Sequence, residues 1–162
     1  MANNKMSIEL AERSLKVART FNAPRDLVFQ AYTDPDALKQ WFGPEGWPLT
    51  VSTMDFRVGG TWHYCMTGPE GEEAWGIATY DEIVAPERLV YRDAFSDADG
   101  NIVPPESAVT IEFVEQGPSE TSLQITSIFA SNDERDQVIA MGMEEGMAQT
   151  LDHLEEYLAK QA

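Results

Sequence analysis

Residues 107–158 read SAVTIEFVEQGPSETSLQITSIFASNDERDQVIAMGMEEGMAQTLDHLEEYL. The first part contains two runs in which apolar and polar side chains alternate, and Gly117-Pro118 separates them. Such alternation is typical of β-strands with one buried face. From Asn132 to Leu158, a polar start at 132–137 is followed by apolar side chains that recur every three or four residues between Ala140 and Leu158, which is the period of an amphipathic α-helix. The segment therefore predicts a hairpin followed by one long C-terminal helix.

The predicted C-terminal helix has one apolar face. Asn132 provides a capping side chain, and acidic residues follow in the first turn. Gly142 and Gly146 lie inside the helix, and each costs about 1 kcal/mol relative to alanine. We therefore expect a bend there, or room beside the helix for a loop or a ligand. The apolar stripe contains Ala140, Met143, Met147, Leu151, Leu154 and Leu158, with Ile139 and Tyr157 at its edge.

Four further strand-like runs precede this segment. They are rich in Val, Ile, Thr and aromatic residues, and short turns containing Gly or Pro separate them, with a longer polar loop at 96–105. Short links between successive strands imply an antiparallel meander, and a strand at 14–22 brings the sheet to about seven. The four runs are LTVSTMDFRV (49–58), TWHYCMTG (61–68), AWGIATYDEIV (74–84) and RLVYRDAF (88–95).

Two short helices are predicted between the first strand and the rest of the sheet. Pro24 suits the first turn of one helix, because proline lacks an N–H that would have no partner there. Asp34-Pro35 ends that helix and caps a second, which runs to Trp41 or Phe42. Because an apolar sheet face and an amphipathic helix cover each other, we predict an α+β fold. In it the antiparallel sheet curls around the C-terminal helix, and the short helices close one end.

Length and composition limit the classes of function. A chain of 162 residues, 43% of them hydrophobic, forms one core, so we expect one domain over 14–162 after an extension at 1–13. The formal charge of −17 disfavours nucleic-acid binding, and no apolar run is long enough for membrane insertion. The N-terminal segment lacks the pattern of a secretory signal, so we expect a cytoplasmic location.

Few side chains could hold a metal or act as a nucleophile. With one cysteine, Cys65, and two histidines, neither a Cys-based zinc cluster nor a His-rich site can form, and we predict no metal and no cofactor. His63 is predicted on the outer face of its strand and His153 off the apolar stripe of the helix, so both are interpreted as surface histidines. Cys65 has no basic neighbour to activate it, which favours an inert, buried or half-buried thiol.

The predicted interior combines aromatic and thioether side chains. Alternation places Trp62, Tyr64 and Met66 on the inner face of their strand. The facing of 75–80 and 89–93 stays open, because a bulge near Gly76 would shift the register. An aromatic and methionine lining suits a pocket for a small apolar or aromatic molecule, although the same side chains could simply fill a core. The candidate ligand-binding residues are Trp41, Trp62, Tyr64, Met66, Tyr80, Tyr91, Asp93, Met143 and Met147.

Asp93 and Glu112 are the carboxylates on predicted strands that bear most on chemistry. A lone buried charge is costly, so an inward-facing Asp93 must be paired or neutral. No histidine or other base is recognisably paired with an orienting group, so catalytic residues are not assigned from the sequence.

Four motifs in order resemble a known family. They are APRDLVFQAYTDPDALKQWFGPEGW (23–47), VGGTWHYCMTGPEGEE (58–73), GIATYDEIVAPERLVY (76–91) and GMAQTLDHLEEYL (146–158). The chain resembles the bacterial family named after the C-terminal domain of the heat-shock-protein-90 ATPase activator, within the START-like (SRPBCC) superfamily. This resemblance implies a helix-grip fold. In that fold an antiparallel sheet wraps a long C-terminal helix, and a ligand cavity can lie between the two. Many relatives have Trp where Met147 stands here, a difference that would enlarge or soften the cavity wall.

Three functions follow as hypotheses. The first is a binding protein that holds a small hydrophobic molecule between sheet and helix. The second is a cyclase- or hydrolase-type enzyme, with Tyr64, Tyr91 or Asp93 as proton donors or acceptors and an aromatic or polyketide-like substrate. The third is a chaperone partner or stress-response module, whose acidic surface would speed association with a basic partner. Exposed strand edges could also pair in a homodimer.

Overall fold

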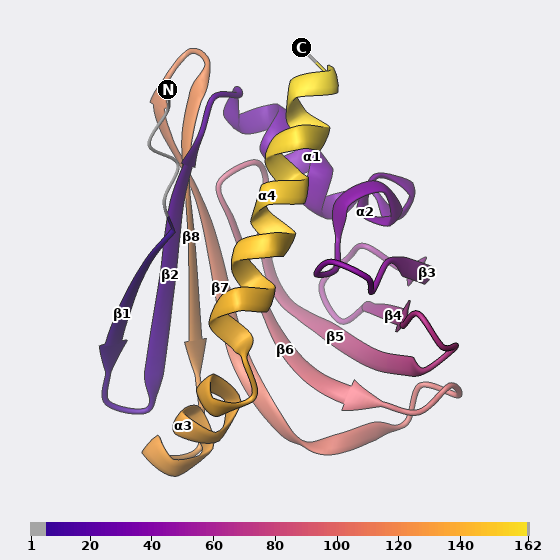
Figure 1. The fold of residues 1–162 in the computed structure, drawn as a ribbon. Coiled ribbons are helices and arrows are strands. Elements are labelled where there is room, and N and C mark those ends of the chain that lie inside the picture. The colour runs from indigo at the N-terminus through magenta and orange to yellow at the C-terminus, as the bar shows by residue number, and fades with distance from the viewer. Residues whose placement is uncertain (1–5, 162) are drawn as a thin grey trace.

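The computed structural model describes residues 6–161. Eight antiparallel strands form one sheet in the order β1-β2-β8-β7-β6-β5-β4-β3. Figure 1 shows this sheet curled around helix α4. The strands are β1 (Ser7–Ala11), β2 (Ser14–Phe21), β3 (Leu49–Met54), β4 (Thr61–Thr67), β5 (Glu73–Val84), β6 (Arg88–Ser96), β7 (Ile102–Gly117) and β8 (Glu120–Ile128). The helices are α1 (Arg25–Thr33), α2 (Pro35–Trp41), α3 (Asn132–Ala140) and α4 (Met143–Gln161).

The predicted antiparallel meander is confirmed, with eight strands rather than seven. The eighth strand is β1, which lies in the segment expected to be an N-terminal extension. It pairs with β2. The strand has only five residues, and four of them are exposed, so little burial marks it in the sequence. Strand β7 begins at Ile102, which shortens the loop predicted at 96–105. The bulge expected near Gly76 lies elsewhere, because the register of β5 shifts between Tyr80 and Glu82.

Helices α1 and α2 cover one end of the sheet, as predicted (Figure 1). The Asp34 carboxylate accepts a hydrogen bond from the backbone N–H of Asp36 at 2.9 Å, which caps α2. Trp41 at the end of α2 is buried, and its indole N–H donates to the backbone carbonyl of Ala31 in α1 at 3.1 Å. This bond and the shared burial fix the two helices against each other.

The prediction of one continuous C-terminal helix is wrong. Helix α3 ends at Ala140, and α4 begins at Met143. Between them Gly142 has φ +88°, a left-handed conformation that side chains other than glycine rarely adopt, and this breaks the helix. Ala140 is therefore exposed instead of lying in the apolar stripe of α4. The cap is Ser131 rather than Asn132, since the Ser131 hydroxyl accepts from the N–H of Glu134.

The core lies between α4, the concave face of the sheet and helices α1 and α2. Leu151, Leu154 and Leu158 of α4 are buried in it, as the stripe predicts. Aromatic rings dominate the α1–α2 end: Phe29 and Phe113 meet edge to face with centroids 5.1 Å apart. This packed half positions α4 across the sheet.

One charged side chain lies beneath α4. Arg19 of β2 is only 6% exposed, and its guanidinium pairs with Asp152 at 2.7 Å and also with Glu155. The same guanidinium lies 5.4 Å from the centroid of the Phe21 ring. These contacts join the middle of α4 to the sheet.

Candidate functional site

A cavity of about 260 Å³ lies at the other end of α4 from helices α1 and α2. Strands β4 to β8 form its floor, with the start of α4 on one side and α3 beyond it. Its wall is largely apolar, which suits a ligand that buries hydrocarbon surface. The apolar side chains in this wall include Leu15, Met66, Val109, Phe129, Val138, Met143 and Met147.

Tyr64 and Asp93 form a polar pair in this apolar wall. Tyr64 lies opposite Gly76 in the β4–β5 ladder, while Asp93 lies opposite Ala78 in the β5–β6 ladder. The Tyr64 ring therefore crosses β5, and its hydroxyl donates to Asp93 Oδ1 at 3.0 Å.

Gly76 makes this crossing sterically feasible. A Cβ placed on Gly76 would lie 2.8 Å from Tyr64 Cε2 and nearer still to Cζ, so any larger residue would push the ring away. The absence of a side chain at this position thus brings the hydroxyl to the carboxylate.

Burial changes the ionisation of both members of the pair. Desolvation raises the pKa of Asp93 from 3.8 to about 6, although hydrogen bonds from the Tyr64 hydroxyl and the Ala94 amide oppose this increase. Desolvation and the nearby Asp93 charge also raise the pKa of Tyr64 well above 10. Tyr64 therefore remains a neutral hydrogen-bond donor, while Asp93 changes charge close to neutral pH.

Two further carboxylates line the cavity, Glu106 from β7 and Glu134 from α3. Glu106 lies 3.8 Å from the guanidinium of Arg92, which is itself paired with Asp81 at 3.1 Å. The side chains that line the cavity include no Lys, Arg or His. The local charge is consequently negative.

Five of the nine predicted ligand-binding residues meet at this cavity: Tyr64, Met66, Asp93, Met143 and Met147. The other four lie elsewhere. Trp41, Trp62 and Tyr80 are buried in the core, where each contacts other aromatic rings, and Tyr91 packs against the core near Tyr80. Trp62, Tyr80 and Tyr91 thus hold the core positions given by the alternative interpretation, whereas Trp41 is buried in the core and also lines a pocket between α2 and α4. The predicted inward facing of Trp62 and Tyr64 is confirmed, since both are buried on the concave face.

Sequence reasoning missed the outer part of the cavity. Phe95 lines it although 60% of this residue is exposed, and the register between β6 and β7 shifts between Asp93 and Phe95. Val138 and Glu134 reach the cavity because the chain turns at Gly142, which sends α3 in a new direction. The glycine at 142 was the only signal for this arrangement in the sequence.

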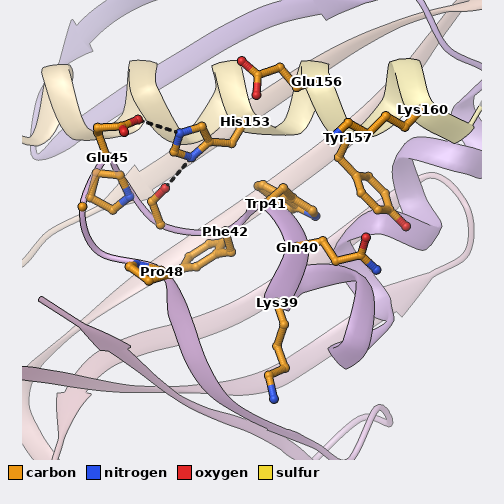
Figure 2. Close-up of a pocket in the computed structure, with 13 residues that line it drawn as sticks. Lys39, Gln40, Trp41, Phe42, Glu45, Pro48, His153, Glu156, Tyr157 and Lys160 are labelled. Carbon is orange, nitrogen blue, oxygen red and sulfur yellow. Dashed lines mark hydrogen bonds and ion pairs between the residues drawn. The ribbon is translucent and has the colours of Figure 1, made fainter. Parts of the chain in front are cut away.

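A second pocket of about 260 Å³ lies between the end of α2 and α4, and Figure 2 shows its lining. Here the interpretation of His153 as a surface residue is wrong. The side chain is 28% exposed, and its ring nitrogens lie 2.9 Å from the Gly43 carbonyl oxygen and 3.2 Å from Glu45 Oε1. His153 thereby ties the loop after α2 to α4, which is a structural connection (Figure 2).

The remaining chemically notable side chains lie on the opposite face of the sheet. His63 stacks on Trp75 with centroids 4.9 Å apart, and Cys65 is a buried free thiol, as expected. Over residues 6–161 there is no group of three or more His, Cys, Asp or Glu side chains placed to hold a metal ion. Within the same residues, no helix has the length and apolar character needed to cross a membrane.

The sequence matches the family model described as "Activator of Hsp90 ATPase homolog 1-like protein" over residues 22–159. The chain belongs to this family. Its α+β helix-grip architecture is that of the START-like Hsp90-activator homologues, and membership fits a START-like ligand-binding protein in general terms. None of the curated proteins compared with the chain matches it.

Solved structures of bacterial proteins share the fold of this family member. A solution structure from Arthrobacter aurescens is 32% identical, with a TM-score of 0.87 and coverage of 95% of this chain and 91% of that one. One from Staphylococcus epidermidis is 33% identical, with a TM-score of 0.85 and coverage of 97% and 96%. A crystal structure from Rhodobacter sphaeroides is 25% identical, with a TM-score of 0.86 and coverage of 96% and 99%.

Proposed function

We propose that this family member binds a small, largely apolar molecule in the cavity between β4–β8 and the start of α4. The observation that carries the proposal is an apolar cavity with one hydrogen-bonding pair, Tyr64 and Asp93, in its wall. Ligand sites commonly combine a hydrophobic lining with a few polar groups that orient the ligand. A cavity of about 150 Å³ holds benzene, so a volume of about 260 Å³ suits a ligand with one or two rings.

The rest of the molecule supports this location. Met143 and Met147 reach the cavity from α4, and methionine adapts its shape to different ligands more readily than branched side chains do. Both are half-buried, whereas the leucines of the same helix are buried in the core. The C-terminal half of α4 therefore packs in the core through its leucines, while its first turns face the cavity through Met143 and Met147.

Filling the cavity tests the proposal. We expect the neutral dye N-phenyl-1-naphthylamine to fluoresce when bound to the wild-type protein, and Met147→Trp to weaken its binding by about tenfold because the indole occupies ligand space. Met141→Trp is the matched control, since Met141 is 72% exposed and lies outside the cavity lining. Equal binding by both variants would place the dye elsewhere and argue against this site.

A second candidate function is proton transfer, and the Tyr64–Asp93 pair favours it. A carboxylate with a pKa of about 6 in an apolar cavity is a stronger base than an exposed aspartate, and the Tyr64 hydroxyl holds it in place. Such a carboxylate could accept a proton from a bound substrate, which corresponds to an enzyme of the cyclase or hydrolase type.

A generic substrate tests for this base. In 5-nitrobenzisoxazole, transfer of the C3 proton to a carboxylate forms a nitrile as the N–O bond breaks, and the ring opens to coloured 2-cyano-4-nitrophenolate. We expect a rate above background that rises with pH through a midpoint near 6, and loss of that rate in Asp93→Asn. An unchanged rate in Asp93→Asn would assign the reaction to other groups and remove this candidate.

A further inference from the structure

We infer that the ligand of this cavity carries a protonated amine, or a comparable cationic hydrogen-bond donor, on an apolar body. The inference rests on the proposed function and adds the chemical class of the ligand to it. It follows from the charges that line the cavity and from the position of Asp93 among them.

The cavity lining carries carboxylates from three separate elements. Asp93 comes from β6, Glu106 from β7 and Glu134 from α3, and no cationic side chain accompanies them in the lining. Arg92 lies within 4 Å of Glu106, but within residues 6–161 neither Asp93 nor Glu134 has a salt-bridge partner. Two negative charges at the cavity are therefore left for a ligand to balance.

Asp93 is the group that a ligand would reach in the apolar floor. A carboxylate offers about four acceptor positions, and the Tyr64 hydroxyl and the Ala94 amide use two of them. Placing a carboxylate against hydrocarbon is costly, and a cationic donor compensates for that cost better than water at an apolar wall does. The rings of Tyr64 and Phe95 also line the cavity and would attract a cation further.

An anionic ligand would be repelled by the carboxylates that line the cavity. A fatty acid or aromatic acid would bring a further negative charge next to Asp93 and Glu134, with no guanidinium or ammonium in the lining to receive it. A neutral alcohol could donate to Asp93 but would leave the charge of the carboxylate unbalanced. The structure therefore ranks the three chemistries as amine, then alcohol, then acid.

The titration of Asp93 makes the ranking depend on pH. The ionisable groups around it are Tyr64 from β4, Tyr91 on its own strand, Glu106 from β7 and Glu134 from α3. Desolvation raises the pKa of Asp93 to about 6, against the hydrogen bonds from the Tyr64 hydroxyl and the Ala94 amide. An amine that stays protonated should consequently lose its advantage as the pH falls from 8 to 5, because the carboxylate becomes neutral.

A matched series of ligands tests the inference by isothermal titration calorimetry. The probes are 1-naphthylmethylamine, 1-naphthalenemethanol and 1-naphthoic acid, which share one ring system and differ in the polar group. At pH 8 we expect the amine to bind at least about tenfold more tightly than the alcohol, and the acid most weakly. At pH 5 the amine should bind about as tightly as the alcohol.

Variants locate the effect at Asp93. Asp93→Asn should remove the advantage of the amine at pH 8 while leaving alcohol affinity within about threefold. Glu112→Gln is the control, because it removes one negative charge from the same sheet outside the cavity lining and should leave the ranking unchanged.

The outcomes separate the two proposals. Equal affinity of amine and alcohol at pH 8, or an amine advantage that survives in Asp93→Asn, overturns the inference while leaving the binding function in place. Absence of binding by all three probes overturns the binding function for ligands of this size, and the inference with it.

Discussion

Gly76 controls the position of the Tyr64 ring, and replacing it with alanine, which adds one methyl group, tests this. We expect Gly76→Ala to lower the free energy of unfolding by about 1–3 kcal/mol, because the new Cβ overlaps the end of the buried Tyr64 ring, which must move out of its packed position. The displaced hydroxyl should also lose its hydrogen bond to Asp93. Urea unfolding measures the first effect.

Gly117→Ala provides the comparison for this variant. Gly117 is also a strand glycine, but the atom nearest to an added Cβ is Glu120 Cβ at 3.9 Å, an ordinary contact. The free energy of unfolding of the Gly117→Ala protein should differ from that of the wild type by no more than about 0.5 kcal/mol. A similar loss in both variants would attribute the effect to glycine in a strand rather than to the Tyr64 ring.

Asp93 makes stability depend on pH with a defined sign. Its pKa in the folded protein is about 6, above the ordinary value of 3.8, so the folded state binds a proton more readily than the unfolded state. Stability therefore falls as the pH rises from about 4 to 6. Asp93→Asn should remove this fall and be more stable than wild type above pH 6, by on the order of 2 kcal/mol, with no difference below pH 4.

Asp97 should behave in the opposite way in the same denaturation series. Hydrogen bonds from the side chain and backbone of Asn101 lower the pKa of Asp97. Its contribution to stability is present above its ordinary pKa and is lost as the pH falls. Asp97→Asn should thus be less stable than wild type at neutral pH and equal to it in acid. Parallel curves for the Asp93 and Asp97 variants would contradict both assignments.

Helix α3 is the least anchored of the four helices. None of its side chains is buried, whereas α4 buries Thr150, Leu151, Leu154 and Leu158. Elements with few buried apolar contacts open locally before the molecule unfolds. In hydrogen exchange read by mass spectrometry, we expect amides of α3 to exchange at least about tenfold faster than those in the middle of α4. Equal protection of α3 and α4 would show that the two helices open together.

The sequence allowed most elements to be predicted, and the exceptions have physical causes. Strand β1 was not predicted because it has only five residues and four of them are exposed. Pairing with β2 and the half-buried Ile8 hold it to the sheet. The glycines at 142 and 146 predicted a bend in one helix, but the apolar stripe drawn from Ala140 onward did not indicate a complete break. The left-handed backbone of Gly142 is what separates α3 from α4. Periodicity reports which faces are buried, and it does not report where a chain changes direction.

The same limit applies to the candidate site. Alternation along β4 was enough to place Tyr64 on the inner face, and the helix stripe was enough to name Met143 and Met147. Asp93 was named only as a strand carboxylate, because the facing of 89–93 had stayed open. Alternation could not say which inward side chains face a cavity and which face one another, because Trp62 and Tyr64 share one face. Their surroundings depend on long-range packing: Trp62 is covered by the loop after α2 through Phe42, at a centroid distance of 5.1 Å.

At the scale of the whole molecule, the formal charge of −17 predicts a salt dependence. Like charges repel one another more in the compact state than in the unfolded chain, and salt screens this repulsion. The melting temperature should therefore rise between 20 mM and 500 mM NaCl at pH 7, by about 2–4 °C for each kcal/mol gained. The rise should shrink at pH 4, where carboxylates begin to protonate. An equal rise at both pH values would point to a general salt effect instead.

The packed aromatic cluster and the cavity occupy opposite ends of α4. Substitutions at Val138, Met143 or Met147 alter the cavity while leaving the leucines and rings that hold α4 to the sheet in place. Under the proposed binding function, evolution could change the residues of the cavity half while preserving the half that maintains the fold. On that proposal, a few substitutions in the cavity would change the ligand of related proteins without unfolding them at any step.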